Sequence, residues 1–398
     1  MRSRLAEPSA DGTGREGDLL LACSRTERSP EVVERVRTLM AKGLDPDTLL
    51  RLARPHGLMP LLHWHLGSAE ASGVPPAVRD ELRRHFEANT RRNLKLTGEL
   101  LRLLSLFEYH GIPAVPFKGP LLAASAYGNL ALREFVDVDI VVRQRDVLAA
   151  TKVLASLGYR PTDGLTDAQR DAQIEWGWEC TLWNPEPQVL VDLHWRFAPR
   201  YFSIDLVLDR LWTRRQCVSI GGVRVSVLAP EDLLLILAVH GARHCWTRLE
   251  WVCGVAELIR AHGALDWRRT THEAAGLGSL RILWLGVLLA HGMLDAPVPR
   301  EIVQRARADR RAVALAAAVR RRLLGGRLRE PGATKRMVFD CLARERLADK
   351  VRYLVHFATR PNEQDMAWLP LPSWLSFAYS FLRPLRLIAT HARLPSKT

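Results

Sequence analysis

One segment, Val136 to Val142, constrains the fold more than any other because acidic and β-branched residues alternate along it. Successive side chains of a β-strand point to opposite faces, so Asp137 and Asp139 share one face and the apolar residues share the other. The Cα atoms of the two aspartates are then about 7 Å apart, and their charges repel each other unless a cation lies between them. Because aspartate is uncommon in strands, we favour a metal site over a solvent-exposed strand face.

A third carboxylate occurs in a second strand-like segment, Val189 to Trp195. Asp192 shares a face with Leu190 and His194 in an otherwise apolar run, and a lone buried carboxylate is costly unless a partner neutralises it. If the two strands are neighbours, the three acids form an oxygen-rich site suited to Mg²⁺. Two such ions, about 3.5–4 Å apart, would bind the attacking and leaving oxygens of a phosphoryl transfer. For His194, simple packing explains the residue better than support of a metal ligand.

Upstream of the paired aspartates, Phe117 to Pro120 predicts a turn from a strand into a helix. Backbone N–H groups at a helix N-terminus attract phosphate, and Gly119 permits close approach of the chain. Lys118, one of seven lysines in the sequence, can reach the same anion. The turn lacks the glycine and lysine spacing of a P-loop, so its position ahead of the aspartates is what indicates a phosphate site.

Hydrophobic periodicity divides the 398 residues into five parts. Residues 1–28 show no periodicity and are predicted to be a disordered leader, and residues 29–110 form an N-terminal helical region. Short β-rich runs alternate with helices over residues 111–228, which predicts the core. Residues 229–346 are again helical, and residues 347–398 are predicted to be a C-terminal helical arm. The pattern predicts an α+β protein with a small mixed sheet between helical regions.

The predicted core has its strands and helices at defined positions. The segment Asn184 to Pro187 separates two strand-like runs and predicts a hairpin between them. The predicted strands span residues 114–117, 135–142, 179–183 and 189–195, and the predicted helices span residues 121–127 and 146–157.

The formal charge of +14 comes almost entirely from arginine. Such a balance fits a polyanionic partner, but the arginines are spread along the chain, which favours solvated helix faces. The basic stretch Arg300 to Arg329 could hold an RNA acceptor, although the sequence contains no base-reading module for RNA or DNA. Charge alone therefore leaves an RNA partner open.

Cysteine usage and hydropathy indicate the compartment. Six cysteines without a CxxC pair exclude a disulfide scaffold and a zinc ribbon, and they fit a reducing environment. Leu20 to Cys23 looks like a lipoprotein cleavage site, but polar and acidic residues precede it instead of an apolar region. The longest apolar stretch, Ile282 to Ala290, is far below the ~20 residues of a membrane-spanning helix. We therefore expect a cytoplasmic protein without a transmembrane segment.

Two further patterns have alternative interpretations. His240 and His244 share a helical face, but without a third ligand we favour histidines that line a nucleotide cleft over a zinc site. The aromatic and basic segment Trp368 to Ile388 suits either a membrane surface or packing on the core. Prolines interrupt any long amphipathic helix there, so we favour packing.

The order of these segments resembles the uncharacterised nucleotidyltransferase family of the DNA polymerase β-like superfamily. The resemblance covers most of residues 45–390. The combination of segments indicates the family, whereas no single segment does so by itself. Further segments that carry it are Arg92-Asn93, Pro230 to Leu234, His240, His244 to Trp246 and Leu382 to Leu387.

The resemblance implies a palm-like nucleotidyltransferase core between helical regions. By its pattern Asp137 and Asp139 hold the metal ions, and Asp192 completes the site and helps to deprotonate the acceptor hydroxyl. Lys118, Gly119 and Arg133 match the nucleotide-side positions, with Arg133 clamping a phosphate. That list of six residues is the predicted site.

Two departures from the pattern stand out. The superfamily's usual Gly-Ser turn is Lys118-Gly119 here, which puts the phosphate geometry in doubt. An acid often follows the Trp-bearing helix segment in the family, and Gly254 stands there in this sequence. The second departure concerns a secondary polar contact and leaves the metal site untouched.

The sequence thus predicts a Mg²⁺-dependent nucleotidyltransferase that transfers a nucleoside monophosphate from an NTP to an acceptor hydroxyl and releases pyrophosphate. The acceptor is open among RNA, a protein or peptide, and a small molecule, and no residue pattern selects the base. The alternative is a catalytically degenerate module that binds nucleotide or RNA without turnover. A third reading is an RNA-binding helical protein whose aspartates are merely solvated. Only this last protein would fail to respond to Mg²⁺.

Overall fold

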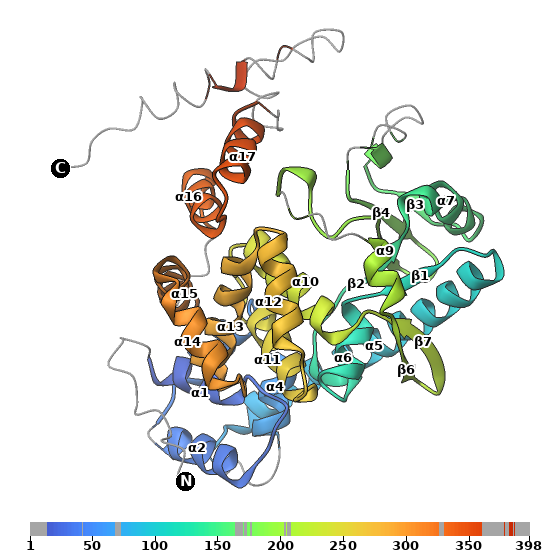
Figure 1. The fold of residues 1–398 in the computed structure, drawn as a ribbon. Helices are drawn as coiled ribbons and strands as arrows, with labels where there is room; N and C mark the ends of the chain where they lie inside the picture. The colour runs from blue at the N-terminus through green and yellow to red at the C-terminus, as the bar shows by residue number, and fades with distance from the viewer. Residues whose placement is uncertain are drawn as a thin grey trace.

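A five-stranded mixed sheet lies in the middle of the chain, with helices before and after it (Figure 1). The computed structural model describes residues 14–359 except 42, 68–72, 164–169, 171–172, 176, 203, 205–207 and 326–329, together with 378, 382–384 and 386. The strands are β1 (Ala114–Pro116), β2 (Asp137–Val142), β3 (Arg160–Pro161), β4 (Glu179–Asn184) and β5 (Val189–His194), in the spatial order β1-β2-β5-β4-β3. The fold is α+β, as the sequence predicted.

The pairing of the strands fixes which residues are neighbours. β2 and β5 are parallel, and every other pair in this sheet is antiparallel. β4 and β5 form the hairpin that the segment Asn184 to Pro187 predicted. A separate two-stranded ribbon, which the sequence did not indicate, consists of β6 (Gln216–Ile220) and β7 (Val223–Val227).

The apolar face of the sheet packs against two helices. α5 (Pro76–Tyr109) begins with a proline in its first turn, where the missing N–H costs nothing. Its residues Leu96, Leu100 and Leu103 are spaced one turn apart and contact the β-branched residues of β2 and β5. α7 (Val147–Ser156) covers the rest of this face through Val147 and Leu154. The apolar side chains that β2 and β5 place on this face are fully buried, and their burial stabilises the sheet.

The remaining described elements fall into three groups: those around the sheet, those before it in the sequence and those after it. Around the sheet lie α6 (Gly119–Ser125), α9 (Leu208–Thr213) and the 3₁₀ turns η1 (Leu130–Leu132), η2 (Gln144–Asp146) and η3 (Arg200–Phe202). The N-terminal helices are α1 (Arg15–Cys23), α2 (Pro30–Ala41), α3 (Pro46–Ala53) and α4 (Met59–Leu66). The C-terminal helices are α10 (Pro230–Arg243), α11 (Leu249–Ala261), α12 (Trp267–Gly276), α13 (Leu280–Leu294), α14 (Arg300–Ala308), α15 (Arg310–Leu324), α16 (Ala333–Ala343) and α17 (Leu347–Thr359).

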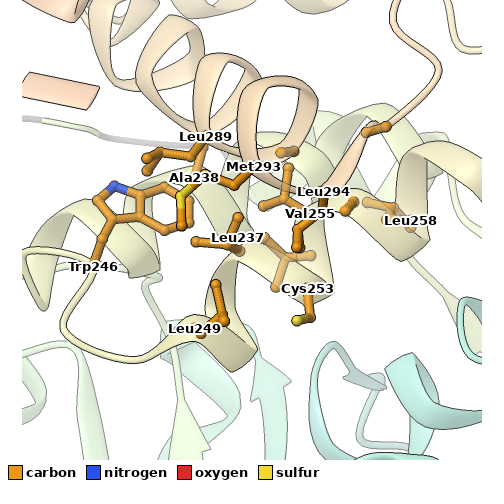
Figure 2. Close-up of a cluster of buried hydrophobic side chains, with 14 of the residues drawn as sticks. Leu237, Ala238, Trp246, Leu249, Cys253, Val255, Leu258, Leu289, Met293 and Leu294 are labelled. Atoms are coloured by element: carbon orange, nitrogen blue, oxygen red, sulfur yellow. The ribbon is translucent and has the colours of Figure 1, made fainter. Parts of the chain in front are cut away.

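A second core, mostly helical, lies beside the sheet and also takes in Val115 of β1 and Val141 of β2. α10, α11 and α13 bury side chains against one another around Trp246, which is fully buried (Figure 2). Cys245 and Cys253 are also buried, as small apolar residues. This core holds α10 and α11 in place. Side chains of these two helices face the polar side of the sheet.

The prediction of a disordered leader over residues 1–28 is wrong for its second half. Residues 15–23 form α1, and Leu19, Leu20 and Cys23 are among the most deeply buried residues of the helical core. Arg25 follows and forms an ion pair with Asp295 at 3.0 Å. A run of five apolar residues after a polar stretch is too short to show periodicity, so the sequence pattern did not predict this helix.

The structure bears on two expectations about membranes, one about a spanning helix and one about the segment Trp368 to Ile388. Among the described residues, no helix is both long and apolar enough to cross a bilayer. Most of the segment Trp368 to Ile388 lies outside the described residues. Within it, Arg383 is buried, and its Nε donates a hydrogen bond of 2.7 Å to the carbonyl oxygen of Phe357 at the end of α17. At this residue the segment packs against the chain.

Candidate active site

The polar face of the sheet opens into a cleft of about 290 Å³. Strands β2, β4 and β5 form its floor, and α10 and α11 form its roof. Five of the six residues of the predicted site line it: Lys118, Arg133, Asp137, Asp139 and Asp192. The fold thus brings together side chains that are up to 74 positions apart in the sequence.

The register of the two parallel strands creates the acidic centre. Asp139 on β2 is directly opposite Asp192 on β5, and Asp137 is opposite Leu190. Residues in register on adjacent strands point to the same face, and strands are about 4.8 Å apart. Two carboxylates are therefore held side by side by backbone hydrogen bonds, and a one-residue slip would send one of them into the apolar core.

Asp139 is the most enclosed of the three acids, with 3% of its surface exposed. Lys118 Nζ lies 2.6 Å from its Oδ1, and His194 Nε2 lies 3.2 Å from the same oxygen. Burial by itself would raise the pKa of Asp139, but the Lys118 ammonium and the His194 hydrogen bond hold it well below its ordinary value. Asp139 is therefore an anion at any working pH.

The other two acids are shifted in the opposite direction. Burial and the charge of Asp139 raise the pKa of Asp137 to about 7, and they also raise the pKa of Asp192. Thr181 on β4 donates a hydrogen bond of 2.7 Å to Asp192 Oδ1 and fixes its orientation. Crowding of carboxylates thus costs free energy, which a bound cation would recover.

The donor set fits a divalent cation. Asp139, Asp192 and His194 each offer one ligand atom, and these atoms all lie within 4.8 Å of one another. Glu179 Oε2 lies 3.3 Å from His194 Nδ1, an arrangement that orients a metal-binding imidazole in many sites. Asp137 lines the same cleft but lies outside this group of three.

The segment that carries Arg133 is held from below by α5. Buried Asn93 donates a hydrogen bond of 2.7 Å to the Arg133 carbonyl oxygen, and Asn89 donates one of 3.2 Å to the same atom. The guanidinium lines the cleft, and its buried Nε and Nη1 have no hydrogen-bond partner within the described part of the chain. Because buried donors are normally paired, these two atoms suit an anionic ligand.

The roof of the cleft is aromatic and basic. His240, His244 and Trp251 lie with their rings in contact, and Arg243 adjoins them. Burial lowers the pKa of His240 well below its ordinary value and that of His244 to about 3, and the neighbouring cations add to both shifts. Both imidazoles are therefore neutral at pH 7 and present no charge to a ligand.

The comparison with known families agrees with this geometry. A family model described as an uncharacterised nucleotidyltransferase matches residues 42–295, which is more than half of the chain. The chain belongs to this family. The matched residues include the sheet, the cleft and every residue of the predicted site. A search of curated proteins finds no match. Helices α14 to α17 lie outside the matched range.

Within this family member, Gly119 lies away from the cleft. It stands at the start of α6 with φ of +49°, and a Cβ on it would lie 3.3 Å from the carbonyl oxygen of Asp137. The glycine therefore permits close contact between α6 and β2, and phosphate contact by Gly119 stays a prediction.

Sequence reasoning overlooked three acidic or imidazole side chains of the site. His194 was interpreted as a packed residue, although it is two positions after Asp192 on the same strand face, and this spacing was the available signal. Glu179 enters only through the β4–β5 register, where it is opposite His194. Glu250 is buried at the cleft one helical turn before Gly254, and burial raises its pKa against the effect of nearby Arg248.

Proposed function

We propose that this protein is a divalent-metal-dependent enzyme that transfers a nucleoside monophosphate from an NTP to an acceptor hydroxyl, with release of pyrophosphate. The observation that carries the proposal is the pairing of Asp139 with Asp192 across two parallel strands, beside Asp137 and within one cleft that Lys118 and Arg133 also line. Membership of a nucleotidyltransferase family supports the same reaction class.

Asp139 and Asp192 would hold the metal ion, with Asp137 as a further ligand and His194 either as a ligand or as the group that orients Asp139. A bound divalent cation supplies charge neutralisation at the phosphate oxygens during the transfer. Carboxylates suit Mg²⁺ and Mn²⁺, whereas an imidazole favours later transition metals. We propose Mg²⁺ as the physiological ion and include Mn²⁺ in the test because of His194.

The protein's own side chains perform the remaining tasks. Arg133 offers two unpaired donors to the phosphate groups, and a guanidinium binds phosphate in a bidentate fashion. Lys118 adds a second cation at the same end of the cleft. Holding the acceptor oxygen in line with the α-phosphorus converts an encounter of two substrates into a reaction within one complex.

The proton of the acceptor hydroxyl needs a base, and Asp192 is the carboxylate best placed for this role. Its raised pKa increases its affinity for a proton at neutral pH. Thr181 donates a hydrogen bond to one oxygen of Asp192. The other oxygen would accept the proton. The new bond joins the acceptor oxygen to the α-phosphorus, and the bond to the bridging oxygen breaks as pyrophosphate leaves.

The test is to incubate the protein with each α-labelled NTP, a cell extract and Mg²⁺ or Mn²⁺, and to identify what becomes labelled. Labelling should require the metal and disappear in the Asp139→Asn variant. The Asp209→Asn variant is the matched control because Asp209 is exposed and lies outside the cleft. Metal-dependent NTP binding without any labelled product would favour the degenerate binding module instead. If neither metal alters NTP binding, the enzyme proposal fails.

A further inference from the structure

A second cavity, of about 280 Å³, adjoins the catalytic cleft. The two cavities share His244, Arg248 and Trp251, so these side chains form the wall between them. The outer walls of the second cavity come from Pro55, which precedes α4, and from Arg322 on α15. None of the aspartates of the cleft lines this second cavity.

Arg322 is the chemically unusual residue of this cavity. Its Nη2 donates a hydrogen bond to the carbonyl oxygen of Cys245, and its buried Nε has no hydrogen-bond partner among the described residues. Burial lowers the pKa of Arg322, and in the described part of the chain no carboxylate forms an ion pair with it. Arg248, across the cavity, is paired with Glu250 at 3.0 Å. A half-buried cation without a counter-ion fits an anionic ligand.

The turn between α10 and α11 carries two of the three wall residues, His244 and Arg248, and is conformationally strained. Cys245 and Trp246 have φ of +52° and +53°, in the left-handed region that non-glycine residues rarely adopt. The turn is held by a hydrogen bond of 2.7 Å from Trp246 N to the Gly241 carbonyl oxygen and by Arg322 on Cys245. Strained backbone of this kind concentrates at ligand-binding sites. Arg322 thus both supports the wall and faces the cavity.

We propose that the second cavity is the acceptor pocket, and that the acceptor carries an anionic group, a phosphate or a carboxylate, that binds Arg322. This inference rests on the proposed nucleotidyl transfer and names its acceptor class. The NTP phosphates occupy the cleft beside Lys118 and Arg133, and the acceptor hydroxyl reaches the cleft past Trp251. A cavity of this size accommodates a small molecule or the end of a chain, and it has no room for a nucleic-acid helix. Glu330 also lines the cavity, and its carboxylate disfavours negative charge other than the group that binds Arg322.

The experiment measures binding of inorganic phosphate and of acetate to the full-length protein, by calorimetry, with Mg²⁺ and a saturating non-hydrolysable NTP analogue present. The analogue occupies the cleft and prevents phosphate from binding to Lys118 and Arg133. At least one of the two anions should bind, and its dissociation constant should rise about tenfold or more in Arg322→Gln. The anion that binds more tightly identifies the acceptor as a phosphate or a carboxylate compound.

Two further variants separate binding from folding. Thr247→Glu adds a negative charge to the cavity at a half-exposed position and should weaken anion binding without removing the Arg322 contact to Cys245. Arg321→Gln removes the neighbouring exposed arginine, which lies outside the cavity, and should leave binding unchanged. Thermal melts without anion check that all variants are folded.

The proposal is overturned if neither anion binds the wild type, if Arg322→Gln and Thr247→Glu bind as the wild type does, or if the NTP analogue displaces the Arg322-dependent anion. The last result would make the cavity part of the nucleotide site. Failure of the analogue itself to bind with Mg²⁺ would instead contradict the proposed function. In that event, titration of phosphate and acetate into the wild type and the same variants without nucleotide still tests the cavity by itself.

Discussion

The two faces of the β2–β5 strand pair belong to the same twelve residues but have opposite physical characters. On one face Val138, Ile140 and Leu193 are fully buried against α5 and α7. On the other face Asp137, Asp139 and Asp192 crowd into a cleft. The first face stabilises the sheet through burial of apolar surface. The second face costs stability through carboxylate repulsion, and this cost is characteristic of a site that is completed by a ligand.

The largest expected effect is on turnover in Asp137→Asn. Loss of a proposed metal ligand should lower turnover by about a thousandfold or more and weaken metal-dependent NTP binding. Without metal the variant should melt about 2–4 °C higher, because one crowded carboxylate has gone. A turnover assay beside a melt with and without Mg²⁺ checks both parts. Normal turnover in this variant would make the aspartate structural.

The pH dependence of that effect has a definite sign. The pKa of Asp137 in the folded protein is about 7, above its value of about 4 in an unfolded chain. The folded state therefore binds this proton more tightly, and its contribution to stability is lost as pH rises from about 4 to 7. Metal-free wild type and Asp137→Asn should thus differ more in melting temperature at pH 7 than at pH 4.

Asp192→Asn should separate chemistry from binding. As the proposed base, Asp192 contributes mainly in the transition state, so its loss should lower turnover by about 10²–10³-fold. NTP binding should change less than turnover, because Asp137 and Asp139 would still hold the metal ion, and a loss mainly in turnover is the pattern of an interaction made in the transition state. Parallel measurements of NTP affinity and turnover test this. An equal loss in both would assign Asp192 to substrate binding.

On the opposite face, Ile140→Ala should unfold the protein more easily without touching the chemistry. Removal of a fully buried isoleucine leaves a cavity and should lower the free energy of unfolding by about 3 kcal/mol. Val136→Ala is the matched control because Val136 is exposed. Denaturant titration measures both variants. A loss below about 1 kcal/mol for Ile140→Ala would mean that the apolar face does not carry the sheet.

The helical core should respond to pH in the opposite direction from the acidic face. His56 has no exposed surface and is held between the Leu323 carbonyl oxygen and the Leu249 N–H, and burial lowers its pKa to about 4. The unfolded state therefore binds more protons between pH 6.5 and 4, so stability is lost as pH falls through this window, by about 3 kcal/mol.

The matched variants for this prediction are His56→Gln and His272→Gln. The first removes the buried titrating group and should flatten the decline in stability below pH 6.5. The second replaces an exposed histidine on α12 and should leave the decline as in the wild type. Denaturant midpoints at several pH values provide the measurement, and identical slopes in all three proteins would contradict it.

The smallest expected effect concerns the cation that faces the acidic centre. In the metal-free protein the Lys118 ammonium pairs with Asp139, where it competes with a divalent ion. Lys118→Met should therefore bind Mn²⁺ about tenfold more tightly in the absence of nucleotide while it binds NTP less well. Lys95→Met, an exposed replacement on α5, is the control. Weaker Mn²⁺ binding in Lys118→Met would show that the lysine assembles the metal site.

The sequence by itself predicted four strands and two helices of the core because these depend on local periodicity, but it did not indicate β3 or the β6–β7 ribbon. Strict alternation placed Asp137 and Asp139 on one face, and the predicted core elements agree with the structure within two residues at each end. Periodicity failed at α1, whose apolar run is too short to show a period.

Only the tertiary structure decided which side chains meet. Nothing local to β5 indicates that Asp192 is opposite Asp139, because register is set by packing of the apolar face under α5 and α7. Nor does any local pattern bring Glu179 to His194, or an arginine of α15 to a turn 77 positions earlier. Strand alternation is a property of consecutive residues, whereas a cleft is a property of surfaces that long loops and buried helices bring together.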